Sequence, residues 1–175
     1  IEQLNSLLVV GANLRKDVPL IAHRVRKAAL RGAKVAFVNP RRYEYLFPVA
    51  GYLSANGLDM FEHLIAVAAA VINTSGKTAP ASIAALVANA QPADAHRAIA
   101  QQLLEGERRL ILLGAIAQRD PAFADLSLAA AALSEVTGAP LGYAPEGGNA
   151  VGASLAGVLP HRAVGGRSVQ AAGLN

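Results

Sequence analysis

The sequence has no cysteine among its 175 residues. This absence excludes disulfide bonds, thiolate nucleophiles, iron–sulfur ligation and cysteine-based zinc sites. It also has no long hydrophobic run: mean hydropathy is +0.34, but the longest apolar stretch, 64–72, is about half of the ~20 residues that span a bilayer. No secretory signal is recognisable, because Glu2 stands where a basic segment would begin. We therefore expect a globular chain without direct membrane insertion.

Patterns typical of catalysis are equally scarce. No serine lies in a Gly-x-Ser-x-Gly elbow, and 75–78 imitates the end of a phosphate-binding P-loop only in part. Val71 stands where that motif requires glycine, and the preceding segment is helical in pattern instead of a strand. The histidines have no spacing, with one another or with carboxylates, that suits a metal site; they are His23, His63, His96 and His161. We expect no catalytic residue and no metal ligand in this chain.

The charge balance is basic, with a formal net charge of +4 and a pI near 9.8. The basic residues form short groups such as Arg15-Lys16 and Arg41-Arg42, without interleaved aromatics and without a recognisable nucleic-acid-binding motif. This pattern argues against nucleic acid as a partner. It favours a solvated helix face together with a docking surface for acidic neighbours.

What the chain does contain is an alternation of apolar strands and amphipathic helices. Expected strands cover 7–10, 33–38, 109–113 and 141–144. Expected helices begin near Asp17 and near Asp120, and others cover about 59–73, 82–89, 92–105 and 150–157. The strands are apolar enough to be buried on both faces, as parallel strands are. The sequence thus predicts a three-layer, Rossmann-like α/β domain with a mostly parallel sheet of four to six strands.

Helix boundaries and loops follow from local residues. Asp17 and Asp120 are each expected to cap a helix that has proline in its first turn, and Gly32 and Gly138 to end helices in a left-handed conformation. The segment 43–52 is expected to be an aromatic-bearing loop, and 73–80 an exposed loop or hinge. One further pattern predicts close helix packing, since small residues at 148, 152 and 156 share a helical face.

Four segments resemble the large iron–sulfur subunit of bacterial NADH:quinone oxidoreductase, respiratory complex I, whose C-terminal region belongs to the molybdopterin oxidoreductase superfamily. They are Val9–Asn13, Gly32–Arg42, Gly147–Ala153 and Leu159–Arg162. The first two motifs are common to the superfamily, and the last two are more specific to the complex I branch. The resemblance covers about residues 5–162. It implies a Rossmann-like domain over 1–162 and a flexible tail or linker over 163–175, in a segment cut from a longer polypeptide.

The resemblance also implies a relict cofactor pocket. In cofactor-bearing relatives the loops after the first two strands contact the guanine dinucleotide of the molybdopterin cofactor, and a Pro-Gly-Thr-Asp turn helps. The cofactor-binding residues implied here are Gly11, Asn13, Asn39, Arg41 and Asp59. Asn39 stands where relatives commonly have an acidic residue, and the turn at 56–59 keeps only its glycine and aspartate. Arg41 and Arg42 can clamp a phosphate, although we favour pairing of these arginines with another subunit or domain.

These features give one main functional expectation and two alternatives. The resemblance implies a scaffold domain of a peripheral subunit on the cytoplasmic side of the bacterial inner membrane, which contacts other peripheral-arm subunits of complex I. The parent subunit would carry electrons from NADH and flavin through iron–sulfur clusters toward quinone, and this segment would hold no cofactor. One alternative is the cofactor-binding domain of an active molybdopterin oxidoreductase such as a formate dehydrogenase. The other is a free-standing nucleotide sensor.

Overall fold

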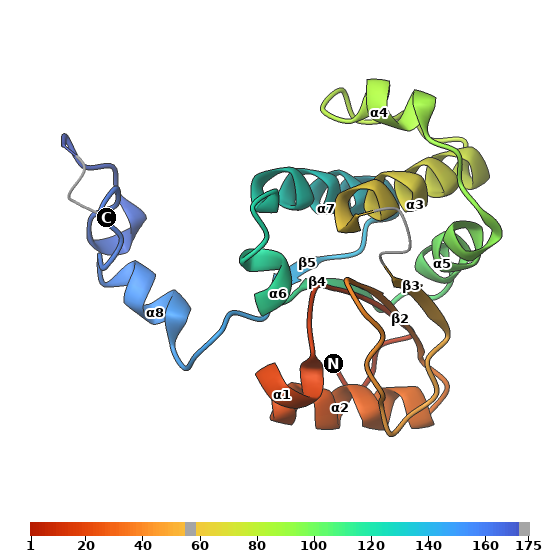
Figure 1. The fold of residues 1–175 in the computed structure, drawn as a ribbon, viewed down its shortest axis with the longest axis horizontal. Coiled ribbons are helices and arrows are strands. Elements are labelled where there is room, and N and C mark those ends of the chain that lie inside the picture. Colours follow the sequence, from red (N-terminus) through yellow and green to blue (C-terminus); the bar gives the residue numbers. More distant parts are fainter. Residues whose placement is uncertain (55–58, 172–175) are drawn as a thin grey trace. The chain divides into compact units, whose positions relative to one another are not determined.

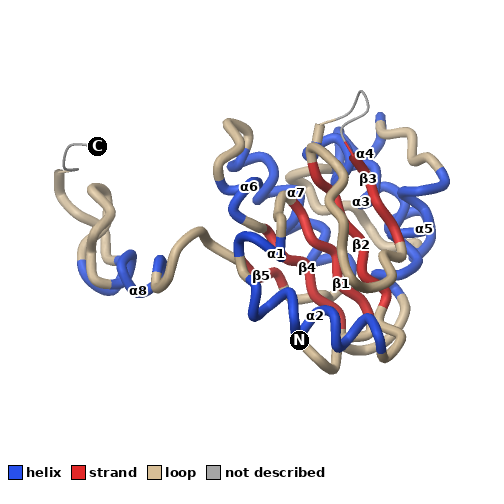
Figure 2. The backbone as a smooth tube through the Cα atoms, turned by 60° about the horizontal axis from the view of Figure 1, so that its bottom comes forward, coloured by secondary structure: helices blue, strands red, loops and turns tan. Residues whose placement is uncertain are grey.

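The computed structural model describes residues 1–54 and 59–171. Its sheet has five strands, all parallel, in the spatial order β3-β2-β1-β4-β5. The strands are β1 (Ser6–Val10), β2 (Lys34–Asn39), β3 (Gly51–Ser54), β4 (Arg109–Leu113) and β5 (Leu141–Tyr143). Figures 1 and 2 show these strands side by side between two layers of helices. The expected α/β class and three-layer, parallel architecture are confirmed.

The sheet is built outward from β1, which is buried along its whole length. On one edge Ser6 pairs with Lys34 of β2, and on the other edge the same residue pairs with Arg109 of β4. A strand covered on both faces must be largely apolar, and the sequence Leu-Leu-Val-Val after Ser6 meets this condition. The apolar run at the start of the chain therefore becomes the centre of the sheet.

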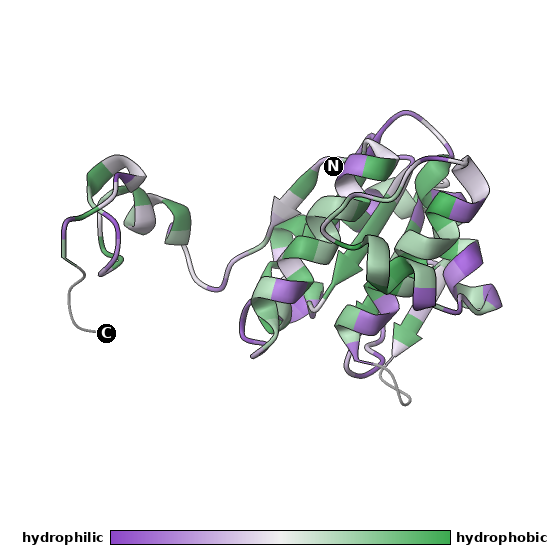
Figure 3. Cartoon of the chain, turned by 90° about the horizontal axis from the view of Figure 1, so that it is seen from above, coloured by the Kyte–Doolittle hydropathy of each residue, from purple (hydrophilic) through white to green (hydrophobic). Residues whose placement is uncertain are grey.

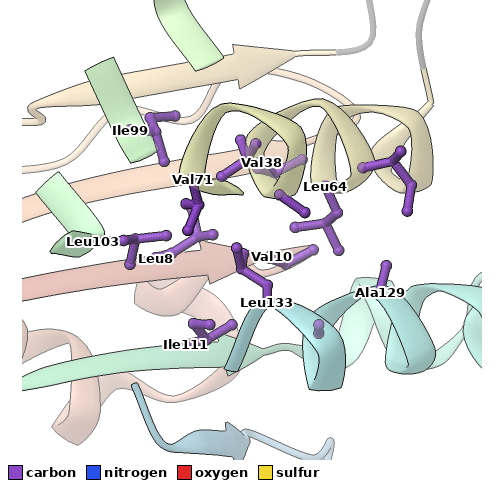
Figure 4. Close-up of a cluster of buried hydrophobic side chains, with 14 of the residues drawn as sticks. Leu8, Val10, Val38, Leu64, Val71, Ile99, Leu103, Ile111, Ala129 and Leu133 are labelled. Carbon is purple, nitrogen blue, oxygen red and sulfur yellow. The ribbon is translucent and has the colours of Figure 1, made fainter. Parts of the chain in front are cut away.

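The helices divide between the two faces of the sheet. They are α1 (Leu14–Asp17), α2 (Pro19–Leu30), α3 (Met60–Ser75), α4 (Ala84–Asn89), α5 (Asp94–Leu104), α6 (Ala115–Gln118) and α7 (Phe123–Thr137). Alternate β1 side chains serve different cores: Leu8 and Val10 pack with α3, α5 and α7, whereas Leu7 and Val9 pack with α1 and α2. Figure 4 shows the first core, and Figure 3 shows hydrophobic residues along the strands with hydrophilic ones on outer helix faces.

Most expected elements lie within two or three residues of their observed positions, and the strand at 109–113 coincides with β4. Gly32 and Gly138 adopt positive φ angles of 100° and 72°, as expected for residues that end helices. Gly76 is also left-handed and ends α3, so the P-loop-like fragment lies at a helix C-terminus, where a P-loop cannot function. The exception is β3, since no strand is expected from its sequence. Its four residues form a strand by pairing with 36–39 of β2.

The two expected aspartate caps are wrong in detail. Asp17 ends α1, and its Oδ2 accepts the backbone N–H of Asn13 at 2.8 Å, whereas α2 begins after Val18 without a side-chain cap. The carboxylate turns back because α1 is a separate helical turn ahead of α2. Asp120 accepts the backbone N–H of Ala122 at 2.9 Å, and α7 begins one residue later.

The chain divides into two compact units, Ile1–Ala144 and Pro145–Asn175. The second unit contains α8 (Ala150–Leu155) and a short 3₁₀ turn, η1 (Val164–Gly166), which contact each other. The expected boundary at 162 falls inside this unit. The compact α/β unit ends instead with Ala144, which directly follows the last strand.

Within the second unit, the small residues at 148, 152 and 156 do not form a packed face, and packing of this face against another element stays a prediction. Gly148 precedes α8 and is exposed, and no residue of α8 is buried. A Cβ at Gly152 would first meet the side chain of Asn149, 2.1 Å from its Oδ1. The glycines accommodate the turn that leads into α8, in which Asn149 has a φ of 62°.

Candidate functional site

Ligands of parallel α/β sheets bind beyond the carboxyl ends of the strands, where the strand order reverses. In this sheet that point lies between β1 and β4. The turns that follow the two strands touch each other: Gly114 N–H donates to Val10 O at 2.8 Å, and Ala117 N–H donates to Gly11 O at 3.0 Å. A Cβ at Gly11, whose φ is 59°, would lie 2.4 Å from Ala117 N, and one at Gly114 would lie 2.2 Å from Ala12 Cβ. Backbone therefore occupies the crevice.

The backbone N–H groups of the turn after β1 are also engaged. Gly11 N–H donates to Val38 O at 2.8 Å, Ala12 N–H to Asn39 Oδ1 at 2.8 Å, and Asn13 N–H to Asp17 Oδ2 at 2.8 Å. A phosphate-binding turn needs such groups free and pointing at the ligand. Here they are bonded within the protein, and one of them faces a carboxylate.

Asn39, at the end of β2, holds this turn in place. Its side-chain Nδ2 donates to Ala12 O and to the hydroxyl of Tyr52, both at 3.1 Å, while Oδ1 accepts from Ala12 N–H. The residue is 1% exposed. An amide can donate to and accept from the backbone of one residue at the same time, whereas an ionised carboxylate cannot donate. The side chain expected to read a cofactor thus has both of its N–H groups committed inside the fold.

Aromatic side chains anchor the 43–52 segment over the sheet. The ring of Tyr45 stacks on that of Phe37 with centroids 4.3 Å apart, and Phe47 lies 5.2 Å from Tyr45. The Tyr45 hydroxyl donates to Ala12 O at 3.2 Å, and burial raises the pKa of this hydroxyl. The Tyr52 hydroxyl donates to Arg41 O at 2.7 Å and accepts from Tyr43 N–H at 3.0 Å. These contacts fix the backbone that carries the neighbouring arginines.

A basic groove of about 420 Å³ lies beyond the ends of β1 and β2. It is lined by Asn13, Arg15, Lys16, Arg41, Arg42, Tyr43 and Glu44. In the part of the chain that the structure describes, none of its four cations forms an ion pair with a carboxylate. The guanidinium of Arg41 lies over the ring of Tyr43, at 5.2 Å from its centroid, and that of Arg42 lies 5.5 Å from the centroid of Tyr52. Arg15 donates to Glu44 O at 3.4 Å.

Of the five implied cofactor-binding residues, the structure brings two into this groove. Asn13 and Arg41 line it, while Gly11 and Asn39 are buried beside it in the turn contacts. Asp59 lines another groove, between α3 and α4. Its Oδ1 accepts Glu62 N–H at 2.8 Å and its own N–H donates to Glu62 Oε2 at 3.0 Å, so Asp59 caps α3. The rest of the turn at 56–59 lies outside the described residues.

A buried histidine pair links α3, α5 and β3, and no pattern in the sequence signals it. Ala93 N–H donates to His96 Nδ1 at 3.0 Å, so the His96 proton is on Nε2 and points at His63 Nδ1, also 3.0 Å away. His63 Nε2–H then donates to Ser54 O at 3.2 Å. Desolvation, with the nearby His63 and Arg97, lowers the pKa of His96. Both rings are therefore satisfied as neutral imidazoles that donate and accept within the fold.

The described residues contain no group of three or more histidine, aspartate or glutamate side chains placed to hold a metal ion. Within the described ranges, 1–54 and 59–171, no helix is long and apolar enough to cross a membrane. Comparisons with protein-family models and with curated proteins find no match for this chain.

Proposed function

We propose that this chain is a scaffold domain of the large iron–sulfur subunit of a bacterial NADH:quinone oxidoreductase. In this role it belongs to a peripheral subunit on the cytoplasmic side of the inner membrane and contacts other peripheral-arm subunits. The parent subunit carries electrons from NADH and flavin through iron–sulfur clusters toward quinone. The chain itself has no thiol for a cluster and contributes position and contacts, with no electron chemistry of its own.

The observation that supports a scaffold most strongly is the closed crevice between β1 and β4. Direct contact of the turns at Gly11 and Gly114 leaves no room for a nucleotide there, and the first turn has its N–H groups bonded internally. This Rossmann-like domain keeps its strand order, but its binding crevice is filled. It can still act as a rigid scaffold whose surfaces contact neighbouring subunits. The resemblance carried by 147–153 and 159–162 supports the identity of the parent.

One observation favours the alternative of a cofactor-binding domain in an active molybdopterin oxidoreductase such as a formate dehydrogenase. The basic groove presents Arg15, Lys16, Arg41 and Arg42 without a carboxylate ion-pair partner among the described residues. Arginines can bind phosphates bidentately. A dinucleotide whose phosphates reach this groove from outside the closed crevice would leave the fold unchanged.

A single experiment distinguishes these functions. Native membranes and cytosol are fractionated, respiratory and formate-oxidising complexes are isolated, and tryptic peptides such as 35–41 are located by mass spectrometry. We expect the peptide in the cluster-bearing large subunit of the NADH-oxidising complex. Its recovery with molybdenum in a formate-oxidising enzyme would establish the alternative, and its recovery in a small cytosolic protein would establish a free-standing sensor.

A further inference from the structure

The basic groove concentrates positive charge that the described part of the protein does not neutralise. Four cations face a single carboxylate, Glu44, across a space of about 420 Å³. Arg15, Arg41 and Arg42 are held by a backbone carbonyl or by aromatic rings, and within residues 1–54 and 59–171 none of the three forms an ion pair with a carboxylate. Their positions are thus fixed without a counter-charge. By contrast, Lys27 on α2 is paired with Glu2 at 2.7 Å.

The chemistry of the groove suits carboxylates better than phosphate. The N–H groups of Gly11, Ala12 and Asn13 are bonded inside the fold, so backbone donors that would cradle a phosphate are not available there. What remains are long cationic side chains spread along a surface. Planar guanidinium groups on such a surface match side-chain carboxylates, which they bind through paired hydrogen bonds.

The groove continues into an apolar depression. A space of about 390 Å³ shares Arg15 and Arg42 with the basic groove. The same space shares Leu46 and Phe47 with a mainly apolar depression of about 230 Å³, which we call the Leu46 depression. Leu46 is 70% exposed there, and its carbonyl is fixed by Arg26 Nε at 3.0 Å. The surface therefore joins a cationic half to an apolar half through the same aromatic segment.

We propose that the basic groove and the Leu46 depression together bind an acidic, amphipathic polypeptide segment. The acidic side chains would lie against Arg15, Arg41 and Arg42, and the apolar side chains would cover Leu46. This inference rests on the proposed scaffold function in one respect, because the segment would then belong to a neighbouring subunit of the peripheral arm. Charge complementarity of this kind mainly selects the partner and speeds its association.

The test measures binding of a labelled glutamate-rich peptide, with leucine at every fourth position, to the 175-residue chain by fluorescence anisotropy. The groove variant is Arg15→Glu/Arg42→Glu. The matched control is Arg24→Glu/Lys34→Glu, which makes the same change of charge at exposed positions outside the groove. We expect a loss of roughly tenfold or more in affinity for the groove variant, and a loss of less than about threefold for the control.

A second pair of variants tests the apolar half. Leu46→Ser should weaken binding of the leucine-containing peptide by roughly threefold to tenfold and leave binding of poly-L-glutamate unchanged. Leu20→Ser is the control, because Leu20 is 80% exposed on α2 and lines neither the groove nor the depression. All substituted positions are exposed, so we expect every variant to fold. Thermal unfolding of each variant, followed by circular dichroism, checks that a loss of binding is not caused by misfolding.

Several outcomes would overturn the proposal. They are an equal loss in the two charge variants, tighter binding of GDP than of the peptide, and tighter binding of a single-stranded oligonucleotide with the same dependence on Arg15 and Arg42. Failure of the peptide-binding proposal can be distinguished from failure of the proposed scaffold function, because the two are tested by independent experiments. Location of peptide 35–41 in the NADH-oxidising complex does not depend on the groove, and peptide binding to the isolated chain does not depend on the parent.

Discussion

Replacement of Asn39 by aspartate separates a structural role of this residue from a cofactor-reading role. The two side chains have nearly the same shape, but an ionised aspartate cannot donate. It would keep the bond from Ala12 N–H, lose the bonds to Ala12 O and to the Tyr52 hydroxyl, and place a carboxylate oxygen about where Nδ2 now lies 3.1 Å from Ala12 O. The residue is 1% exposed, so water cannot compensate.

The size of the effect follows from these contacts. Two lost hydrogen bonds, one leaving two oxygens face to face in a buried site, should cost about 2–4 kcal/mol of unfolding free energy near neutral pH. For a chain of this length the melting temperature should fall by roughly 5–15 °C. The loss should be smaller in mild acid, because the introduced carboxyl, once protonated, can donate to Ala12 O again. Its folded-state pKa would lie above the unfolded value, so the penalty grows as pH rises from the unfolded pKa through the folded one.

The assay is urea unfolding followed by circular dichroism at several pH values, with each variant compared with the wild type at the same pH. Asn13→Asp is the matched control, because it makes the same substitution at a half-buried residue that lines the basic groove and makes no side-chain capping hydrogen bond, so no buried donor is lost. A destabilisation by Asn39→Asp no larger than that of Asn13→Asp would refute the structural role. So would a gain in GDP affinity by Asn39→Asp without loss of stability, measured by calorimetry.

Three further outcomes are expected. Gly114→Ala should destabilise the fold by about 1–3 kcal/mol or more, because its Cβ would lie 2.2 Å from Ala12 Cβ; unchanged urea unfolding would show that the turns can separate. Because the pKa of His96 is lowered, its contribution to the free energy of unfolding is fully present above the unfolded pKa of about 6.5 and is lost as pH decreases toward the folded pKa. His96→Gln, which can still accept from Ala93 N–H, should flatten the pH dependence of the unfolding free energy between about pH 5 and pH 8. An unaltered pH profile would contradict this role of His96. Gly152→Leu should change the unfolding free energy by less than about 0.5 kcal/mol, because α8 has no buried residue; a large loss would support the packing hypothesis.

The fold was predictable because its signals are local. Apolar runs such as 109–113 are typical of buried strands, and glycines such as Gly32 and Gly138 mark helix ends in the sequence itself. β3 carries no such signal. It is four residues long, begins at Gly51 and follows a proline-containing segment, so pairing with β2 and not its own composition makes it a strand.

The site was less predictable because its contacts are distant in sequence. The basic residues at 15–16 and 41–42 can be seen as two groups, but only the adjacency of β1 and β2 joins them into one groove. His63 and His96 are 33 residues apart on different helices, so no spacing rule could pair them. For Gly11 the resemblance implied a cofactor contact, whereas the close approach of Ala117 depends on tertiary packing.

The central place of β1 also governs the order in which the chain can assemble. Its β2 edge finds a partner after 28 residues, Ser6 with Lys34, but its β4 edge waits for Arg109. At ribosomal rates of about 5–20 residues per second, the interval between synthesis of these two partners is roughly 4–15 s. Throughout that time an apolar strand edge of the nascent protein lacks its second partner, which makes the stretch 6–10 an aggregation hazard during biosynthesis. We therefore expect chaperones to bind ribosomes that are translating residues 35–113.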